Sequence, residues 1–181
     1  SSDNGRNVWT NALWVGILCN VYRNTKIPRF AEIAGLSEGL LDKCFDDFSG
    51  LLHDVGCMWI PTAVFDWQRT QNPASRRRAL HAANLLAGRY NAAGRFIRAW
   101  HDIPGTNDDT RGWAIIDCML NIPLLHWASE ETGDPRYRHV AMGHADTVME
   151  SFIRQDGSSN HIVEFDPEKG GVVRTLGGQG Y

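Results

Sequence analysis

Two aspartates occur in stretches whose other residues are mostly apolar. Asp54 lies within Gly50–Trp59 and Asp117 lies within Trp113–Asn121. A carboxyl group flanked by Ile and Leu resists ionisation, and a second carboxylate nearby raises one of the two pKa values further. Enzymes keep a general acid protonated near neutral pH in this way. The two residues are therefore candidate catalytic carboxylates.

Their places in the chain strengthen this interpretation. Asp54 precedes Thr70 by nearly the same number of residues as Asp117 precedes Thr132, and His53 stands directly before Asp54. Both aspartates are expected near the N-terminal ends of apolar helices. The alternative is that each Asp caps its helix or is a hydrogen-bonded buried anchor. A helix N-terminus would also lower a carboxyl pKa and oppose the effect of burial.

The histidines show no metal-binding pattern. His139 and His144 are five residues apart but lack the glutamate of a zinc-protease helix, so both are expected on the surface. His161 differs because it follows the glycine-containing loop 156–160. The other three have no partner pattern and are expected to be structural or exposed: His81, His101 and His126. No metal and no organic cofactor is predicted.

The elements that must position these residues are mainly helices. Apolar residues recur at helical spacing in six segments: Val8–Tyr22, Arg29–Phe48, Leu51–Arg69, Ala74–Arg89, Trp113–Thr132 and Pro135–Arg154. A polar loop is expected between Ala99 and Gly112. From Asp156 onward, glycines and short β-like runs at 161–163 and 172–173 predict a loop or a small hairpin.

A repeat organises these helices. Thr70–Pro73 and Thr132–Pro135 each open an amphipathic helix, and Thr25–Pro28 is a fainter third copy. Each of these turns follows a more apolar helix. An apolar helix is surrounded by protein, whereas an amphipathic helix exposes one face to water. Alternation of the two predicts either an inner ring of helices wrapped by an outer ring, or a solenoid.

Composition limits the possible partners. The 181 residues carry a formal net charge of −3, which argues against nucleic acid and anionic membranes as partners. The four cysteines form no C-x-x-C pair and are expected as buried thiols. They favour a cytoplasmic location, with the periplasm after signal removal as the alternative. The seven tryptophans are compatible with stacking on a ring-shaped ligand.

Several motifs together resemble one known family. The segments that carry the resemblance are Trp9–Gly16, His53–Gly56, Gly94–Trp100, Ile115–Leu125, Trp127–Arg136, His144–Asp146 and Gly177–Tyr181. On these motifs the chain is similar to the unsaturated glucuronyl hydrolases, glycoside hydrolase family 88. The resemblance implies an all-α fold, the six-hairpin (α/α)6 barrel, of which residues 1–181 would form about the first three hairpins. The rest of that barrel would then be missing after Tyr181.

The resemblance also implies a reaction. This family releases a 4,5-unsaturated uronic acid from the non-reducing end of lyase-generated oligosaccharides by hydrating the vinyl ether double bond. Asp117 would protonate C4 and activate water, while Asp54 would hold ring hydroxyls and tune Asp117. The implied substrate-binding residues are Trp14, His53, Trp100, His161 and Gln179, with Trp14 and Trp100 as stacking surfaces. The other tryptophans are expected in the core: Trp9, Trp59, Trp67, Trp113 and Trp127.

Two other readings remain open at this stage. The related unsaturated rhamnogalacturonyl hydrolases share the fold but fit these motifs less closely. A non-catalytic helical-repeat module that binds a glycan or peptide is also compatible with the repeat. One departure from the family is Leu52, which stands where an Asp usually precedes the His-Asp pair; it is expected to alter the setting of Asp54 more than the chemistry.

Overall fold

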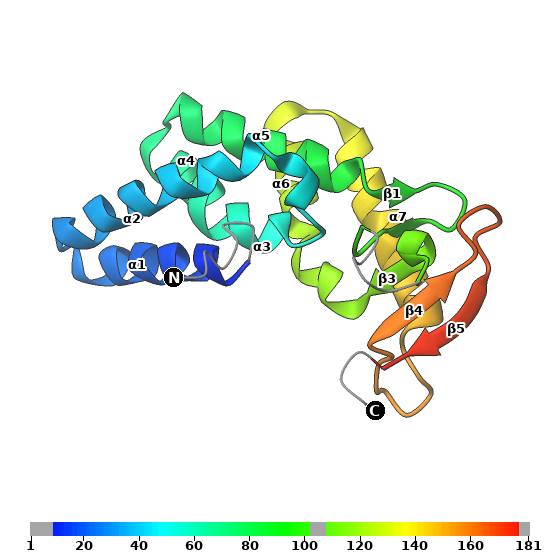
Figure 1. Cartoon of the computed structure of the whole chain (residues 1–181). Coiled ribbons are helices and arrows are strands. Elements are labelled where there is room, and N and C mark those ends of the chain that lie inside the picture. Colours follow the sequence, from blue (N-terminus) through cyan, green and yellow to red (C-terminus); the bar gives the residue numbers. More distant parts are fainter. Residues whose placement is uncertain (1–8, 102–107, 178–181) are drawn as a thin grey trace. The chain divides into compact units, whose positions relative to one another are not determined.

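Helices joined by short turns make up most of the chain in a computed structural model that describes residues 9–101 and 108–177 (Figure 1). Three pairs of helices are each joined by a Thr-x-x-Pro segment: α1 (Thr10–Thr25) with α2 (Pro28–Leu41), α4 (Phe65–Thr70) with α5 (Pro73–Ala87), and α6 (Pro123–Thr132) with α7 (Pro135–Ser151). In every pair the threonine is the last residue of the first helix and the proline begins the second. Proline suits that position because it has no N–H to leave unpaired.

The residue after each threonine is in the left-handed region, with φ of 58° at Lys26, 58° at Gln71 and 71° at Gly133. Its N–H bonds to the carbonyl four residues earlier, at 2.8 to 2.9 Å. The threonine hydroxyl donates to the carbonyl four residues before the threonine, at 2.7 to 2.8 Å. It also accepts a hydrogen bond from the N–H two residues after the threonine, at 3.2 to 3.3 Å. The predicted repeat is therefore confirmed at the level of individual hydrogen bonds, including its third copy.

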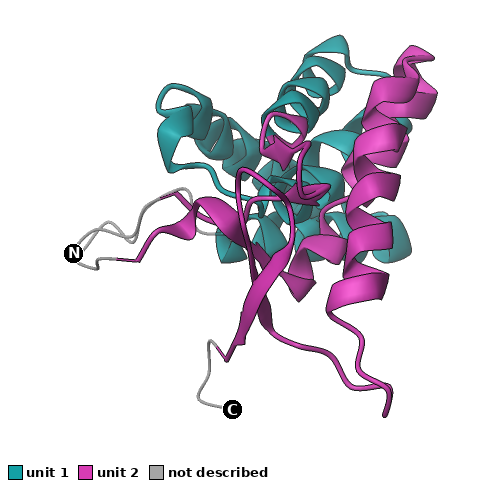
Figure 2. Ribbon diagram, turned by 90° about the vertical axis from the view of Figure 1, so that its right-hand side faces the viewer, with its two compact units in different colours: residues 1–85 teal, residues 86–181 magenta. Residues whose placement is uncertain are grey.

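The chain divides into two compact units, residues 1–85 and residues 86–181 (Figure 2). In the first unit α1 packs along α2 and also contacts α3 (Val55–Trp59) and a π-helical turn over Ile60–Val64. A Cβ placed on Gly16 would lie 2.8 Å from the Pro61 Cβ. Only glycine therefore allows α1 to approach this turn so closely.

Two of the predicted helices in this unit are shorter than expected. The helix predicted over Arg29–Phe48 ends at Leu41, and 3-10 turns follow over Asp42–Phe45 and Phe48–Gly50. The helix predicted over Leu51–Arg69 begins at Val55 and is interrupted by the π-helical turn. Pro61 lies in that turn and cannot donate a backbone hydrogen bond, which explains the break in the regular pattern.

The second unit combines helices with two small antiparallel sheets. One sheet pairs β1 (Tyr90–Asn91) with β2 (Phe96–Ile97), and the other has the order β3 (Trp113–Ile115), β4 (Ile162–Phe165), β5 (Val172–Leu176). Side chains of β2, β3, β4, α7 and the residue directly after α7 form one buried cluster: Phe96, Ala114, Val148, Phe152, Val163 and Phe165. Burial of this apolar surface holds the three-stranded sheet against α7. The predicted hairpin after Asp156 is confirmed as β4 and β5.

The helix predicted over Trp113–Thr132 is wrong in its first half. Trp113–Ile115 is strand β3, Ile116–Leu120 is a 3-10 helix, and α6 begins only at Pro123. The strand forms because β4, far away in the sequence, offers a partner, with Ala114 opposite Val163. A short apolar run fits a helix and a strand equally well, and tertiary pairing decides between them.

The cysteines are thiols, as expected. Cys19, Cys44 and Cys118 are buried and Cys57 is half-buried. Among the described residues, no helix is both long enough and apolar enough to cross a membrane.

Candidate active site

The first candidate carboxylate lies next to a buried histidine. Asp54 directly precedes α3 but its side chain makes no capping hydrogen bond, so helix capping does not explain it. The Nε2 atom of His53 lies 3.4 Å from the Asp54 Oδ1. The His53 side chain is 2% exposed and that of Asp54 22%. The fold thus holds the imidazole rigidly and leaves the carboxylate accessible, as a substrate-contacting group requires.

The second candidate carboxylate lies in the first turn of a 3-10 helix and not at the start of an α-helix. Asp117 lies in the 3-10 helix between β3 and α6, and its side chain is exposed while Cys118 is buried. The expectation that Ile and Leu neighbours would enclose this carboxyl is therefore wrong within this chain. The tighter winding of the 3-10 helix turns successive side chains in different directions, so Cys118 enters the core and Asp117 does not.

Strand pairing places His161 beside Asp117 in the backbone. Ile115 is opposite Ile162 at the end of the β3–β4 ladder, and the N–H of Ile116 donates to the carbonyl oxygen of His161 at 3.1 Å. Asp117 and His161 therefore emerge from the same end of two paired strands, although they are far apart in sequence. The structure brings these two predicted residues together.

His161 also lines a cavity of about 260 Å³ in the second unit. The other lining residues come from the loop before β4 and from the end of β5: Arg154, Ser159, Asn160, Thr175, Leu176 and Gly177. The lining is mostly polar and holds one positive charge, that of Arg154. Gln179, the next predicted contact along the chain, lies outside the described residues.

The predicted stacking tryptophans differ in their surroundings. Trp100 is half-buried and packs edge-on against Trp113, with the ring centroids 6.2 Å apart and an angle of 81° between the planes. The N–H of Ala99 also bonds to the Trp113 carbonyl at 2.8 Å. Strand β3 thereby fixes both the main chain and the ring of Trp100. Trp14, on α1, is 55% exposed.

The expectation of five core tryptophans is only partly correct. Trp59 is buried, at 1% exposure, and three others are half-buried: Trp67, Trp113 and Trp127. Trp9 is 43% exposed, so the core assignment is wrong for it. It lies directly before α1.

One histidine expected on the surface is fully buried. The Nδ1 of His144, on α7, accepts the N–H of Ile97 in β2 at 3.1 Å. The imidazole therefore fixes β2 to α7. The remaining histidines expected outside the core are all exposed: His81, His101, His126 and His139.

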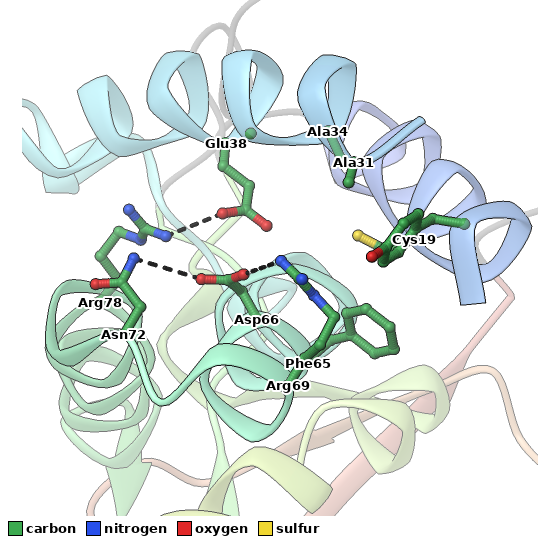
Figure 3. A pocket seen from close by; sticks show the side chains of 11 residues that line it. Cys19, Ala31, Ala34, Glu38, Phe65, Asp66, Arg69, Asn72 and Arg78 are labelled. Carbon is green, nitrogen blue, oxygen red and sulfur yellow. Dashed lines mark hydrogen bonds and ion pairs between the residues drawn. The ribbon is translucent and has the colours of Figure 1, made fainter. Parts of the chain in front are cut away.

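Sequence reasoning missed a polar cavity of about 260 Å³ in the first unit, between α1, α2, α4 and α5 (Figure 3). Glu38 is buried there and pairs with the Arg78 guanidinium at 3.0 Å, while Asp66 pairs with Arg69 at 2.9 Å. Burial raises the pKa of Glu38 to about 7, an effect that Arg78 opposes and that Asp66 and Asp42 reinforce. The only available signal was one Glu in the apolar stripe of α2.

Asp54 and Asp117 belong to different units. The expectation that one carboxylate lies near the other therefore stays a prediction, and so do their separate roles.

Helical hairpins that repeat through one type of turn define the class of α/α-barrel folds. The comparisons with known proteins agree with this class. A solved Asp-to-Asn variant of an unsaturated glucuronyl hydrolase, crystallised with dGlcA-Glc-Rha-Glc, matches with a TM-score of 0.89 and 36% identity, over 99% of this chain and 47% of that one. The enzyme of Bacillus sp. GL1, described as responsible for the degradation of glycosaminoglycan, matches with a TM-score of 0.88 and 38% identity, over 96% and 45%.

A curated relative gives the same result from sequence. The unsaturated chondroitin disaccharide hydrolase of Streptococcus pyogenes serotype M1 is 41% identical over 176 residues, which are 96% of this chain and 43% of that protein. Over nearly its whole length the chain is similar to unsaturated glucuronyl hydrolases, as the motifs predicted, and the predicted (α/α)6-barrel fold is confirmed by these structures. It spans just under half the length of the relatives it matches. A search with protein-family models gave no match.

Proposed function

We propose that the protein carrying this chain is a glycoside hydrolase that releases 4,5-unsaturated uronic acid from the non-reducing end of lyase-generated oligosaccharides. The observation that carries this proposal is the 41% identity to an unsaturated chondroitin disaccharide hydrolase across 96% of the chain. A solved relative with 36% identity holds dGlcA-Glc-Rha-Glc, which supports an oligosaccharide that ends in such a sugar as the substrate class.

The proposed reaction hydrates the vinyl ether. The Asp117 carboxyl donates a proton to C4, and the resulting carboxylate takes a proton from the water that adds to C5. The product is a hemiketal at C5, which opens and expels the remaining sugar from C1. An exposed side chain at the end of paired strands can reach a bound sugar, which supports Asp117 in this role.

The other predicted residues would bind and orient the unsaturated sugar. His161 directly precedes β4, at the end of the sheet where the chain leaves β3 toward Asp117, and it would donate a hydrogen bond to the same ring. Trp100, held by Trp113, offers a fixed aromatic edge or face. Asp54 would hold ring hydroxyls, with its orientation maintained by the buried His53. Trp14 and Gln179 complete the proposed set.

The remaining half of the barrel is the proposed macromolecular partner of this half. Large apolar side chains are exposed along α1 and α2, and they include Leu13 at 42%, Ile17 at 56%, Leu36 at 75% and Leu40 at 56%. Apolar side chains at this density favour burial against further helices. A cytoplasmic location remains our proposal, based on the four thiols.

The test is to incubate the whole protein with an unsaturated chondroitin disaccharide and follow the ultraviolet absorbance of the conjugated double bond. Loss of absorbance with release of the saturated sugar supports the proposal. A parallel reaction with an unsaturated rhamnogalacturonan disaccharide separates the two related activities, and the proposal expects the chondroitin substrate to react faster. Binding of both without any loss of absorbance would instead favour a non-catalytic glycan-binding module.

A further inference from the structure

The first unit holds another cavity, at the C-terminal end of α1 and along α4. It encloses about 270 Å³, which is close to the lower limit for small-molecule sites. Its lining combines two aromatic rings, three cationic side chains and an amide: Tyr22, Phe65, Arg23, Lys26, Arg69 and Gln68. None of the described residues that line it is an acid. A chain with a net charge of −3 therefore gathers positive charge at this place.

Two of the three cations have no ionic partner. Arg23 and Lys26 are exposed, and within residues 9–101 and 108–177 neither side chain forms an ion pair or a hydrogen bond. Arg69 donates to the Asp66 carboxylate at 2.9 Å (Figure 3), and its guanidinium carbon lies 5.4 Å from the centre of the Tyr22 ring. Arg69 is therefore held between α1 and α4, while the charges of Arg23 and Lys26 remain available to a ligand.

The backbone at the end of α1 does not need these two cations. Cations at a helix C-terminus often bond to the last carbonyl groups. Here the side chains of Asn24 and Thr25 donate to the carbonyls four residues before them, both at 2.8 Å. The N–H of Lys26 donates to the carbonyl four residues before it, also at 2.8 Å. The side chains of Arg23 and Lys26 are therefore not required to satisfy the last turn of the helix.

The other copies of the Thr-x-x-Pro turn lead to the same conclusion. Arg23 lies two residues before the threonine of its turn, and Gln68 and Glu130 hold that position in the other two copies. Lys26 directly follows its threonine, where the other copies have a glutamine and a glycine. All three turns nevertheless form the same backbone hydrogen bond. The fold of the turn does not explain a positive charge at either position, so a ligand is the better explanation.

We propose that this cavity binds one acidic sugar unit, of which a uronic acid is the simplest example. The carboxylate of the sugar pairs with Arg23 and Lys26 in charge-assisted hydrogen bonds. The apolar face of the ring packs on the half-buried Phe65. The amide of Gln68 both donates and accepts hydrogen bonds, which suits the hydroxyl groups of a sugar.

The cavity is separate from the candidate active site. Asp54 directly precedes α3, whereas Gln68 and Arg69 lie near the end of the helical segment that residues 55–70 form. At 1.5 Å per residue, a segment of this length is roughly 20 Å long. A sugar unit bound beside Gln68 therefore does not contact Asp54. The proposed site does not depend on the hydrolytic activity proposed above.

The experiment measures the binding of glucuronate, glucose and acetate to the whole protein by ligand-observed NMR at constant ionic strength. Glucuronate has both the ring and the carboxylate, glucose has only the ring, and acetate has only the carboxylate. Arg23→Gln and Lys26→Gln are the main variants, because the second copy of the turn has glutamine at both positions. Arg77→Gln is the matched control, since Arg77 is exposed on α5 and forms no ion pair with any described residue.

The proposed site predicts that glucuronate binds more tightly than glucose and more tightly than acetate. Arg23→Gln and Lys26→Gln each weaken glucuronate binding about tenfold, the effect of one charged hydrogen bond. Arg77→Gln leaves the affinity unchanged. The proposal is overturned if glucuronate does not bind, or if glucose or acetate binds as tightly as glucuronate. It is also overturned if Arg23→Gln and Lys26→Gln both keep the wild-type affinity, because the bound glucuronate then lies elsewhere on the protein.

Discussion

The backbone N–H of Ile116 donates to the carbonyl oxygen of His161 across 3.1 Å. This one bond continues the β3–β4 ladder beyond its last paired residues and determines where the next residue, Asp117, leaves the sheet. The catalytic position proposed for Asp117 therefore depends on β4, which lies about 45 residues later in the sequence. The entropy cost of closing a loop grows only slowly with its length, so a connection of this length is tolerated.

The backbone just before β3 has no room for a side chain at Gly112, because β4 lies directly against it. A Cβ there would lie 1.9 Å from the Phe165 carbonyl oxygen, so the backbone of β4 would have to move. We expect Gly112→Ala to lower the free energy of unfolding by about 3 kcal/mol or more. Gly171→Ala is the control, because nothing lies within 4 Å of the added atom there. Urea unfolding of both variants tests this, and equal stabilities would contradict the close approach.

The repeated turn can be tested by exchanging residues between its copies. Lys26 and Gly133 occupy the same left-handed position, at φ 58° and 71°. Glycine has no steric penalty there, whereas a side chain costs about 1 kcal/mol. Lys26→Gly should therefore raise the free energy of unfolding by about 0.5 to 1 kcal/mol, and Gly133→Lys should lower it by a similar amount. Changes of the same sign in both variants would show that the turns are not equivalent.

The buried Glu38 should make stability depend on pH. Its pKa in the folded protein is raised from 4.5 to about 7, mainly by burial. The folded state therefore holds a proton that the unfolded state releases. The resulting stabilisation is fully present below pH 4.5 and is lost as the pH rises through about 7. Burial also raises the pKa of Asp42, which adds to the same trend.

Denaturant unfolding at about pH 5 and about pH 8 measures this effect. Glu38→Gln should reduce the loss of stability between the two values, because the titrating group is gone. Glu32→Gln is the control, since Glu32 lies on the same helix with its side chain 64% exposed. A pH dependence that is identical in the wild type and in Glu38→Gln would show that Glu38 is not the group responsible.

Local signals in the sequence were sufficient to predict the helical hairpins. Each Thr-x-x-Pro turn makes its hydrogen bonds within a few residues, so it could be recognised without knowledge of the fold. Strand β3 could not, because its pairing partner Ile162–Phe165 is remote in sequence. The buried position of His144 was hidden for the same reason: its partner is the backbone N–H of Ile97, which carries no side-chain signature.

In the candidate site, too, some features could be predicted from the local sequence and others could not. The adjacent pair His53 and Asp54 was visible in sequence, and the structure gives it a geometry, 3.4 Å between Nε2 and Oδ1. The exposure of Asp117 was predicted wrongly because its apolar neighbours were interpreted as part of a buried α-helix. The segment is a 3-10 helix in which the Asp117 side chain is exposed. Motif resemblance supplied the roles that physical patterning alone could not assign.

The assignment of Asp117 as the proton donor is the central claim, and one measurement tests it most directly. The whole protein and its Asp117→Asn variant are compared by the ultraviolet assay on an unsaturated chondroitin disaccharide, with binding of the same disaccharide measured by calorimetry. Loss of a general acid should lower the turnover rate by roughly 10²- to 10⁴-fold while the disaccharide still binds. An Asp117→Asn variant that retains the wild-type rate would contradict the account.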